Sequence, residues 1–292
     1  MCDEDTVKDV EKFEKTQNNL SRRQFNTLTA GAALSAILPS VANAKSVSES
    51  DVVVKTADGE ADCYFVHPAK GKHPAVIIWP DILGLRPAFR QMGKRLAESG
   101  YAVLVINPYY RSAKSPVVNE GDSFQNPDVR QLVLPYYREL SAETTTSDAK
   151  AFVKFVDAQK AVDTSKKMGT TGYCMGGPMT LLTAAAMPER IGAVGSFHGG
   201  GLVTGDANSP HLLIPKMDAD FLIAIADNDD AKAPEVKVVL RTAFDEAGLK
   251  AEIEVYKGAL HGWCPPDSRA YHEVQAERAW SRLLSVFGEA LV

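Results

Sequence analysis

The sequence predicts an α/β fold built on a mostly parallel central sheet with helices on both faces. Short, continuously apolar stretches alternate with longer stretches of helical periodicity from residue 75 to residue 287. The apolar stretches lack the polar–apolar alternation of a strand with one wet face, so they fit strands that are covered on both sides. No Pro/Ser-rich linker and no internal repeat divides this part of the chain, which favours one domain.

Six segments have the composition of buried strands, and five have apolar residues at helical spacing. The predicted strands cover residues 75–79, 101–106, 167–171, 193–197, 221–226 and 251–256. The predicted helices cover residues 87–99, 147–160, 178–187, 234–247 and 268–287. Alternation of the two kinds along the chain is typical of a sheet whose strands are joined by crossover helices.

The first 44 residues have the organisation of an export signal. Arg22 and Arg23 precede a mildly apolar stretch over residues 25–38, which is too short to span a bilayer. Ala42-Asn43-Ala44 then forms a small-x-small cleavage site. The paired arginines favour twin-arginine export, so we expect cleavage after Ala44, a periplasmic location and one mature domain over residues 45–292. An exposed amphipathic helix or a disordered tail is the structural alternative.

Composition and charge limit the kinds of partner. The 292-residue chain has 32 basic and 37 acidic residues, a net charge of -5, and no basic stripe. Nucleic acid and anionic membrane surfaces are therefore poor partners for the mature protein. The glycine-rich segments lack the residues of a P-loop or a dinucleotide fingerprint, and the cysteines lack zinc-site spacing. We expect no metal or cofactor, a small-molecule substrate, and a monomer or small homo-oligomer.

Residues 172–176, Gly-Tyr-Cys-Met-Gly, lie between a predicted strand and a predicted helix. This is the Gly-x-nucleophile-x-Gly elbow, with Cys174 where hydrolases usually have serine. Glycines at both ends let the strand and helix approach closely, and the helix N-terminus favours a thiolate. The backbone N–H of Met175 is then available to bind an oxyanion. A buried structural cysteine beside two glycines is the alternative.

A cysteine nucleophile needs a base and an acid that orients the base, and on this kind of sheet both follow it in the chain. His261, in a glycine-flanked loop after the last predicted strand, is the expected base. His198 follows an earlier strand and is expected to line the pocket wall or cap a turn. The segment Asp-Asn-Asp-Asp after residue 226 offers the acid. We favour Asp229, with Asp230 as the next choice, and expect the other carboxylates to be solvated.

The segments GYCMGG, WPDILGLRPAFRQMGKRLAESGYAVLVINPYYR and LHGW resemble the dienelactone hydrolase family across nearly all of the mature chain. The resemblance implies an α/β-hydrolase fold and a Cys174–Asp229–His261 triad without metal or organic cofactor. It implies hydrolysis of a carboxylic ester or lactone through a thioester on the cysteine. It also implies that the backbone N–H of Ile82 is the second oxyanion donor.

Two positions depart from the family pattern. The family has a glutamate that tunes the thiol where this sequence has Asp81, and a turn-forming aspartate is the alternative reading. Arg130 is the candidate for one of two arginines that grip a substrate carboxylate, but Pro265 stands where the other is expected. Trp263 is a candidate for an aromatic wall instead. These departures put dienelactone itself in question as the substrate.

Cys264 leaves a second function open. Removal of Cys2 with the signal leaves three of the four cysteines, so at least one thiol stays unpaired. Cys264 is either a small packed residue, which we favour, or an oxidation partner of Cys174. The alternatives to a hydrolase are therefore a catalytically silent binding module or a thiol-redox-regulated protein on the same fold. An acyltransferase would use the same acyl-enzyme. Turnover of an ester panel that disappears in Cys174→Ala would separate catalysis from the silent alternatives.

Overall fold

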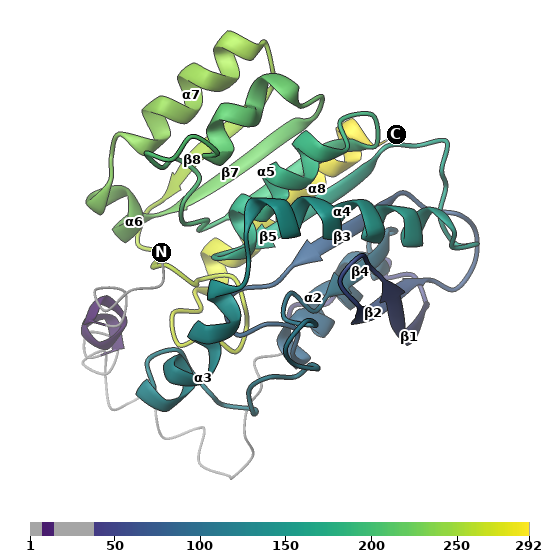
Figure 1. Ribbon diagram of the computed structural model, residues 1–292, viewed down its shortest axis with the longest axis horizontal. Coiled ribbons are helices and arrows are strands. Elements are labelled where there is room, and N and C mark those ends of the chain that lie inside the picture. The colour runs from purple at the N-terminus through teal and green to yellow at the C-terminus, as the bar shows by residue number, and fades with distance from the viewer. Residues whose placement is uncertain (1–7, 15–37, 292) are drawn as a thin grey trace.

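A computed structural model describes residues 8–14 and 38–291, and its centre is an eight-stranded sheet in the order β1-β2-β4-β3-β5-β6-β7-β8 (Figure 1). The strands are β1 (Val47–Lys55), β2 (Glu60–Pro68), β3 (Ala75–Trp79), β4 (Ala102–Ile106), β5 (Met168–Tyr173), β6 (Ile191–Phe197), β7 (Asp220–Ala226) and β8 (Ala251–Tyr256). Strand β2 pairs antiparallel with β1 and β4, and every other pairing is parallel. The predicted α/β architecture is therefore confirmed.

Helices cover both faces of this sheet. They are α2 (Pro87–Glu98), α3 (Pro127–Arg138), α4 (Ala142–Asp157), α5 (Gly176–Ala186), the 3-10 helix η2 (Pro210–Lys216), α6 (Asp227–Lys232), α7 (Val236–Ala247) and α8 (Glu273–Ala290). Helices α2 and α8 pack on one face, and α4, α5 and α7 pack on the other. Alternate residues of β3 divide accordingly, since Ile77 belongs to one hydrophobic cluster and Ile78 to the other.

The sequence prediction lacked the β1–β2 hairpin, helices α3 and α6, and the 3-10 helix η2. The β1–β2 hairpin lies at the sheet edge, and Val54 is the one residue of β1 that is fully buried, so its apolar signal is weak. Helix α3 has a proline at position 135 and buries only Val129 and Val133 completely. Helix α8 also begins five residues later than predicted, because the His272 side chain accepts a hydrogen bond from the Gln275 N–H and caps it there.

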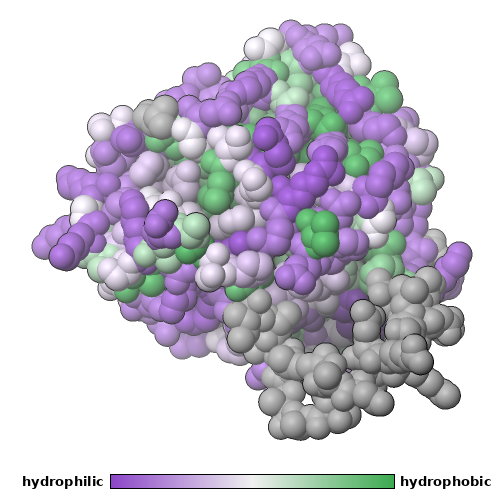
Figure 2. Space-filling view, turned by 180° about the vertical axis from the view of Figure 1, so that it is seen from behind, coloured by the Kyte–Doolittle hydropathy of each residue, from purple (hydrophilic) through white to green (hydrophobic). Residues whose placement is uncertain are grey.

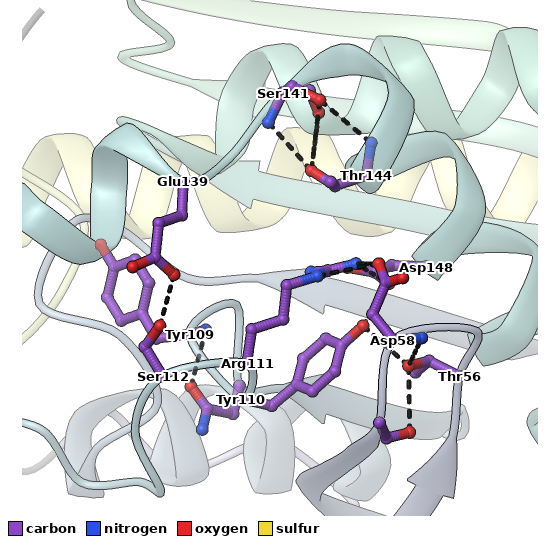
Figure 3. A network of polar contacts seen from close by, with 12 residues as sticks. Thr56, Asp58, Tyr109, Tyr110, Arg111, Ser112, Glu139, Ser141, Thr144 and Asp148 are labelled. Carbon is purple, nitrogen blue, oxygen red and sulfur yellow. Dashed lines mark hydrogen bonds and ion pairs between the residues drawn. The ribbon is translucent and has the colours of Figure 1, made fainter.

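A polar network ties the chain after β4 to α4 (Figure 3). The Arg111 guanidinium donates to both carboxylate oxygens of Asp148 at 2.8 Å, and the Tyr110 hydroxyl donates to the same carboxylate at 2.7 Å. The Ser141 hydroxyl and the Thr144 side chain form a reciprocal capping box that begins α4. These contacts fix the ends of the segment that includes α3.

The face in Figure 2 is mostly hydrophilic, with hydrophobic residues in separate groups. Within residues 8–14 and 38–291, the helices are too short or too polar to cross a membrane.

The expected export motif at Arg22 and Arg23 lies outside the described residues. A short helix over residues 8–14 packs against the body of the protein, where Asp9 accepts a hydrogen bond from Asn228 at 2.9 Å.

Candidate active site

The elbow after β5 holds Cys174 in a left-handed backbone conformation, with φ 53°. Such a conformation is uncommon for a residue other than glycine and is found at strained functional turns. A Cβ at Gly172 would lie 2.1 Å from the carbonyl oxygen of Gly176, and one at Gly176 would lie 2.2 Å from that of Trp79. The backbone N–H of Cys174 donates to Phe197 O at 3.0 Å. Close packing of β3, β5 and α5 therefore requires both glycines and presents the thiol at the carboxyl edge of the sheet.

The loops after β7 and β8 bring Asp229 and His261 together. His261 is 3% exposed, and its Nδ1 lies 2.6 Å from Asp229 Oδ2. The backbone N–H of His261 donates to Asn228 Oδ1 at 2.8 Å, which fixes the loop as well as the ring. Burial opposes a charged imidazole, but Cys174 and Asp229 outweigh it and raise the pKa of His261 to about 10. The ring is therefore suited to hold a proton beside Cys174.

The neighbouring carboxylates face elsewhere. Asp230 accepts from Lys237 Nζ at 2.5 Å, and Asp227 accepts from Lys257 Nζ at 2.8 Å and from the Gly258 N–H at 3.0 Å. Of the three acidic residues that the sequence offered here, Asp229 is the one that contacts the His261 ring.

Ile82 and Met175 lie beside the thiol. Both residues line, together with Cys174, a cavity of about 270 Å³. The turn that carries Ile82 is held by Asp81, whose Oδ1 accepts from the Leu83 N–H at 2.9 Å. The Tyr109 hydroxyl donates to Ile82 O at 2.8 Å. The two expected oxyanion donors thus border the same cavity as Cys174, and the turn that carries Ile82 is held by Asp81 and Tyr109.

Asp81 is part of a buried ion-pair network that the sequence did not predict. The Arg86 guanidinium binds Asp81 through two hydrogen bonds, at 2.7 and 3.0 Å, and binds Asp267 through two more, at 2.6 and 2.9 Å. Arg86 is 4% exposed. Burial raises the pKa of Asp81, although Arg86 acts against this. Arg86 and Asp267 lie far apart in the sequence, so no local pattern could have revealed that this arginine joins the Asp81 turn to the His261 loop.

Arg130 and Trp263 do not line the cavities that border Cys174. Arg130 donates to the carbonyl oxygens of Phe124 and Gln125, at 3.2 and 3.0 Å, and so holds the loop that forms part of the wall. Trp263 is fully buried and stacks on Tyr256, with ring centroids 5.2 Å apart. Both residues therefore lie outside the pocket lining, where Arg130 holds a wall loop and Trp263 packs in the core.

His198 is a buried imidazole within the site. It has a φ of 41°, is 1% exposed, and lines a pocket with Cys174 and His261. Its ring lies 5.1 Å from that of His261, and neither ring nitrogen has a hydrogen-bond partner among the described residues. Burial and the adjacent His261 charge lower the pKa of His198 well below its usual range, so this ring is neutral.

Cys264 lies apart from the nucleophile. It borders an apolar cavity with Tyr173 and Phe197, in the hydrophobic cluster on the α2–α8 face of the sheet, whereas Cys174 belongs to the other cluster. Neither cysteine is in a disulfide, and burial raises the pKa of Cys264 well above its usual range. This environment is that of a packed, unreactive cysteine. Within the described residues, no group of three or more His, Cys, Asp or Glu side chains could hold a metal ion.

Comparisons with known proteins agree with this architecture. The family model described as "Dienelactone hydrolase family" matches residues 61–291. A relative from Salmonella typhi that carries the name carboxymethylenebutenolidase is 26% identical over 253 residues, which cover 83% of this chain and 88% of that protein. A relative of the same name from Escherichia coli K12 is 29% identical over 222 residues, covering 74% of this chain and 77% of that one.

Solved structures show the same fold. A protein from Klebsiella pneumoniae described as a dienelactone hydrolase superposes with a TM-score of 0.72 at 22% identity, covering 84% of this chain and all of that one. A dienelactone hydrolase from Anabaena variabilis superposes with a TM-score of 0.58 at 19% identity, covering 84% of this chain and 99% of that one. Because the family model spans well over half of the chain, this protein belongs to the dienelactone hydrolase family and is a hydrolase with the α/β-hydrolase fold.

Proposed function

We propose that this protein hydrolyses a carboxylic ester or lactone through a thioester on Cys174, with His261 as the proton carrier and Asp229 as the residue that orients it. The observation that carries the proposal is the convergence of three loops at one sheet edge. The left-handed Cys174 follows β5, and the 2.6 Å Asp229–His261 pair follows β7 and β8. Catalytic groups of this fold occupy the same edge.

In the first step, Cys174 Sγ attacks the carbonyl carbon, and the carbonyl oxygen takes the negative charge. The backbone N–H groups of Ile82 and Met175 stabilise this oxyanion. Since Nδ1 of His261 faces Asp229, Nε2 is the atom that gives its proton to the departing alkoxide. The carbon–oxygen ester bond breaks, and the acyl group stays on sulfur.

In the second step, water attacks the thioester carbonyl and gives its proton to Nε2 of His261. The same two N–H groups hold the new oxyanion. Its collapse breaks the carbon–sulfur bond, releases the carboxylic acid and returns Cys174 as a thiolate beside the imidazolium. Asp229 stabilises the charged ring in both steps and keeps Nε2 directed at the reacting atoms.

We propose a substrate class that is broader than dienelactones alone. The names carboxymethylenebutenolidase and lactonase, carried by relatives from Salmonella typhi and Bradyrhizobium, support a lactone or a related ester. The two carboxylates on Arg86 already neutralise it, and Arg130 is directed at backbone carbonyls. Neither Arg86 nor Arg130 is therefore available to bind a substrate carboxylate without rearrangement, and we propose that uncharged esters are also hydrolysed.

The test is turnover of p-nitrophenyl acetate and a dienelactone by the wild-type protein, Cys174→Ala and Cys264→Ala. We expect Cys174→Ala to lose at least 99% of kcat/KM, because no thioester can form, on the scale of nucleophile removal in comparable triads. Cys264→Ala should remain within about twofold of the wild type, since it leaves the catalytic groups in place. Mass spectrometry should find the acyl adduct on the peptide that contains Cys174. Equal turnover by Cys174→Ala and the wild type would contradict the proposal.

We also propose twin-arginine export with cleavage after Ala44. The paired arginines at residues 22 and 23 and the Ala42-Asn43-Ala44 segment support it. N-terminal sequencing of the periplasmic protein should begin at Lys45, and substitution of both arginines by lysine should leave the precursor in the cytoplasm. A periplasmic protein that retains its first residues would contradict cleavage at this site.

A further inference from the structure

Two cavities meet at Cys174, and they differ in size and lining. The smaller, which we call the histidine pocket, has a volume of about 60 Å³ and is bordered by Cys174, His198 and His261. The larger, which we call the methionine pocket, has a volume of about 270 Å³ and is bordered by Cys174, Met175 and Leu134. The methionine pocket is therefore more than four times as large as the histidine pocket.

A third cavity, of about 400 Å³, adjoins the methionine pocket. The two share five lining residues: Tyr137, Arg138, Met175, Gly200 and Gly201. The remaining lining of the third cavity is mixed, with Met179 and Leu182 of α5 beside polar residues such as Thr145, Thr204, Asp206 and Asn208. The apolar space beside the nucleophile is therefore that of the methionine pocket.

The proton carrier identifies which part of the substrate enters which cavity. His261 borders the histidine pocket and is absent from the lining of the methionine pocket. The oxygen of the leaving alcohol must be within reach of His261, since that residue protonates it. The alcohol therefore departs through the histidine pocket. The acyl group, on the other side of the carbonyl carbon, must extend toward the methionine pocket.

The linings agree with this division. The histidine pocket has charged walls that include Asp81, Arg86 and Asp267. The methionine pocket has Leu134, Tyr137 and Met175 beside the nucleophile, with Arg138 as its one charged lining residue. An extended apolar chain would bury its surface against these side chains, whereas a charged or strongly hydrated group would lose solvation there.

Resting on the proposed esterase function, we infer that the methionine pocket is an acyl site, and that the protein prefers esters of extended apolar acids with small alcohols. Each added methylene that enters this pocket should raise kcat/KM about fourfold until the pocket is full. The preference concerns the acid part of the ester and is independent of a carboxylate clamp.

The test compares the methyl esters of acetic, butyric and octanoic acid, which differ only in the acyl group, and follows hydrolysis by titration of the acid released. We expect wild-type kcat/KM to rise at least 30-fold from acetate to octanoate. This threshold is well below the product of a fourfold gain for every added methylene. Leu134→Trp fills the methionine pocket and should lower the octanoate-to-acetate ratio at least tenfold, since the longer chain loses its site. Leu132→Trp is the matched control on the same helix, because Leu132 is 43% exposed and lines neither pocket beside Cys174.

A flat or falling acyl profile, or equal losses on both esters in Leu134→Trp, would overturn the acyl site. No cleavage of any ester by the wild type would instead reject the proposed esterase function. If Leu134→Trp fails to fold, inhibition of the wild type supplies the answer. Octanoate should inhibit acetate-ester hydrolysis competitively and far more strongly than acetate does, and equal inhibition by the two acids would reject the inference.

Discussion

Replacement of Asp229 by asparagine tests the contact on which proton transfer depends. Asp229 Oδ2 lies 2.6 Å from Nδ1 of His261, which is 3% exposed. Burial works against the charged ring, and Cys174 and Asp229 nevertheless raise its pKa from 6.5 to about 10. This rise corresponds to roughly 5 kcal/mol in favour of the imidazolium.

A hydrogen bond to a charged group contributes about 2–3 kcal/mol, so the loss of the Asp229 contact should slow the steps in which His261 carries a proton by roughly 30- to 150-fold. The asparagine amide can also favour the wrong tautomer of the ring, which adds to the loss. We therefore expect Asp229→Asn to lower kcat/KM at least 100-fold, measured at neutral pH from the absorbance of released p-nitrophenolate.

Asp230→Asn is the matched control, since Asp230 is bound to Lys237 at 2.5 Å and faces away from the His261 ring. It should keep kcat/KM within about twofold of the wild type. A loss below about fivefold in Asp229→Asn, or an equal loss in Asp230→Asn, would refute the assignment of the acid. Circular dichroism and thermal unfolding of both variants would separate a catalytic loss from a folding defect.

Three further predictions concern the elements around the triad. Arg86→Met should lower the free energy of unfolding by about 3–5 kcal/mol in urea titrations, since it leaves the buried Asp81 carboxylate unpaired, whereas Arg90→Met should cost less than about 1 kcal/mol. Equal costs would reject the network. Alkylation of Cys174 by iodoacetamide should be nearly constant from about pH 7 to 9, because His261 stays protonated below its pKa of about 10. In His261→Gln the rate should instead rise with pH as for an ordinary thiol near 8.5, and an unchanged profile would contradict the ion pair. Gly172→Ala places a Cβ 2.1 Å from a backbone oxygen and should abolish soluble folded protein or lower the melting temperature sharply, and a fully stable, active variant would contradict the elbow geometry.

The parts of the fold that local sequence could predict are those with a strong, local physical signal. Strands such as β3 and β4 are buried along their whole length, so their side chains are apolar without interruption. Helix α3 and the β1–β2 hairpin have little complete burial, and the selection for apolar residues that would reveal them is correspondingly weak. The start of α8 depends on a single cap at His272, and the spacing of apolar residues does not reveal such a cap.

The site residues also differ in how far the sequence could predict them. The elbow around Cys174 was predictable because its requirement is local, as two glycines four residues apart are needed for one turn. The candidates for the base were limited by the order of strands and loops, which favoured His261. The role expected of Arg130 came from the resemblance, and Trp263 was a candidate for an aromatic wall in place of the incomplete arginine clamp. The structure directs these side chains at a loop and at the core instead.

By itself, the sequence determined the α/β class, the nucleophile elbow and the family resemblance, because each follows from periodicity or from residues that are adjacent in the chain. The sequence favoured Asp229, but only the tertiary structure showed its contact with His261, placed Arg86 between Asp81 and Asp267, and formed a pocket beside Met175. Those features depend on loops that follow different strands, and parallel strands bring such loops to one edge only when the whole sheet has formed. Local patterns describe single turns and faces, whereas a site of this kind is a property of how several loops converge.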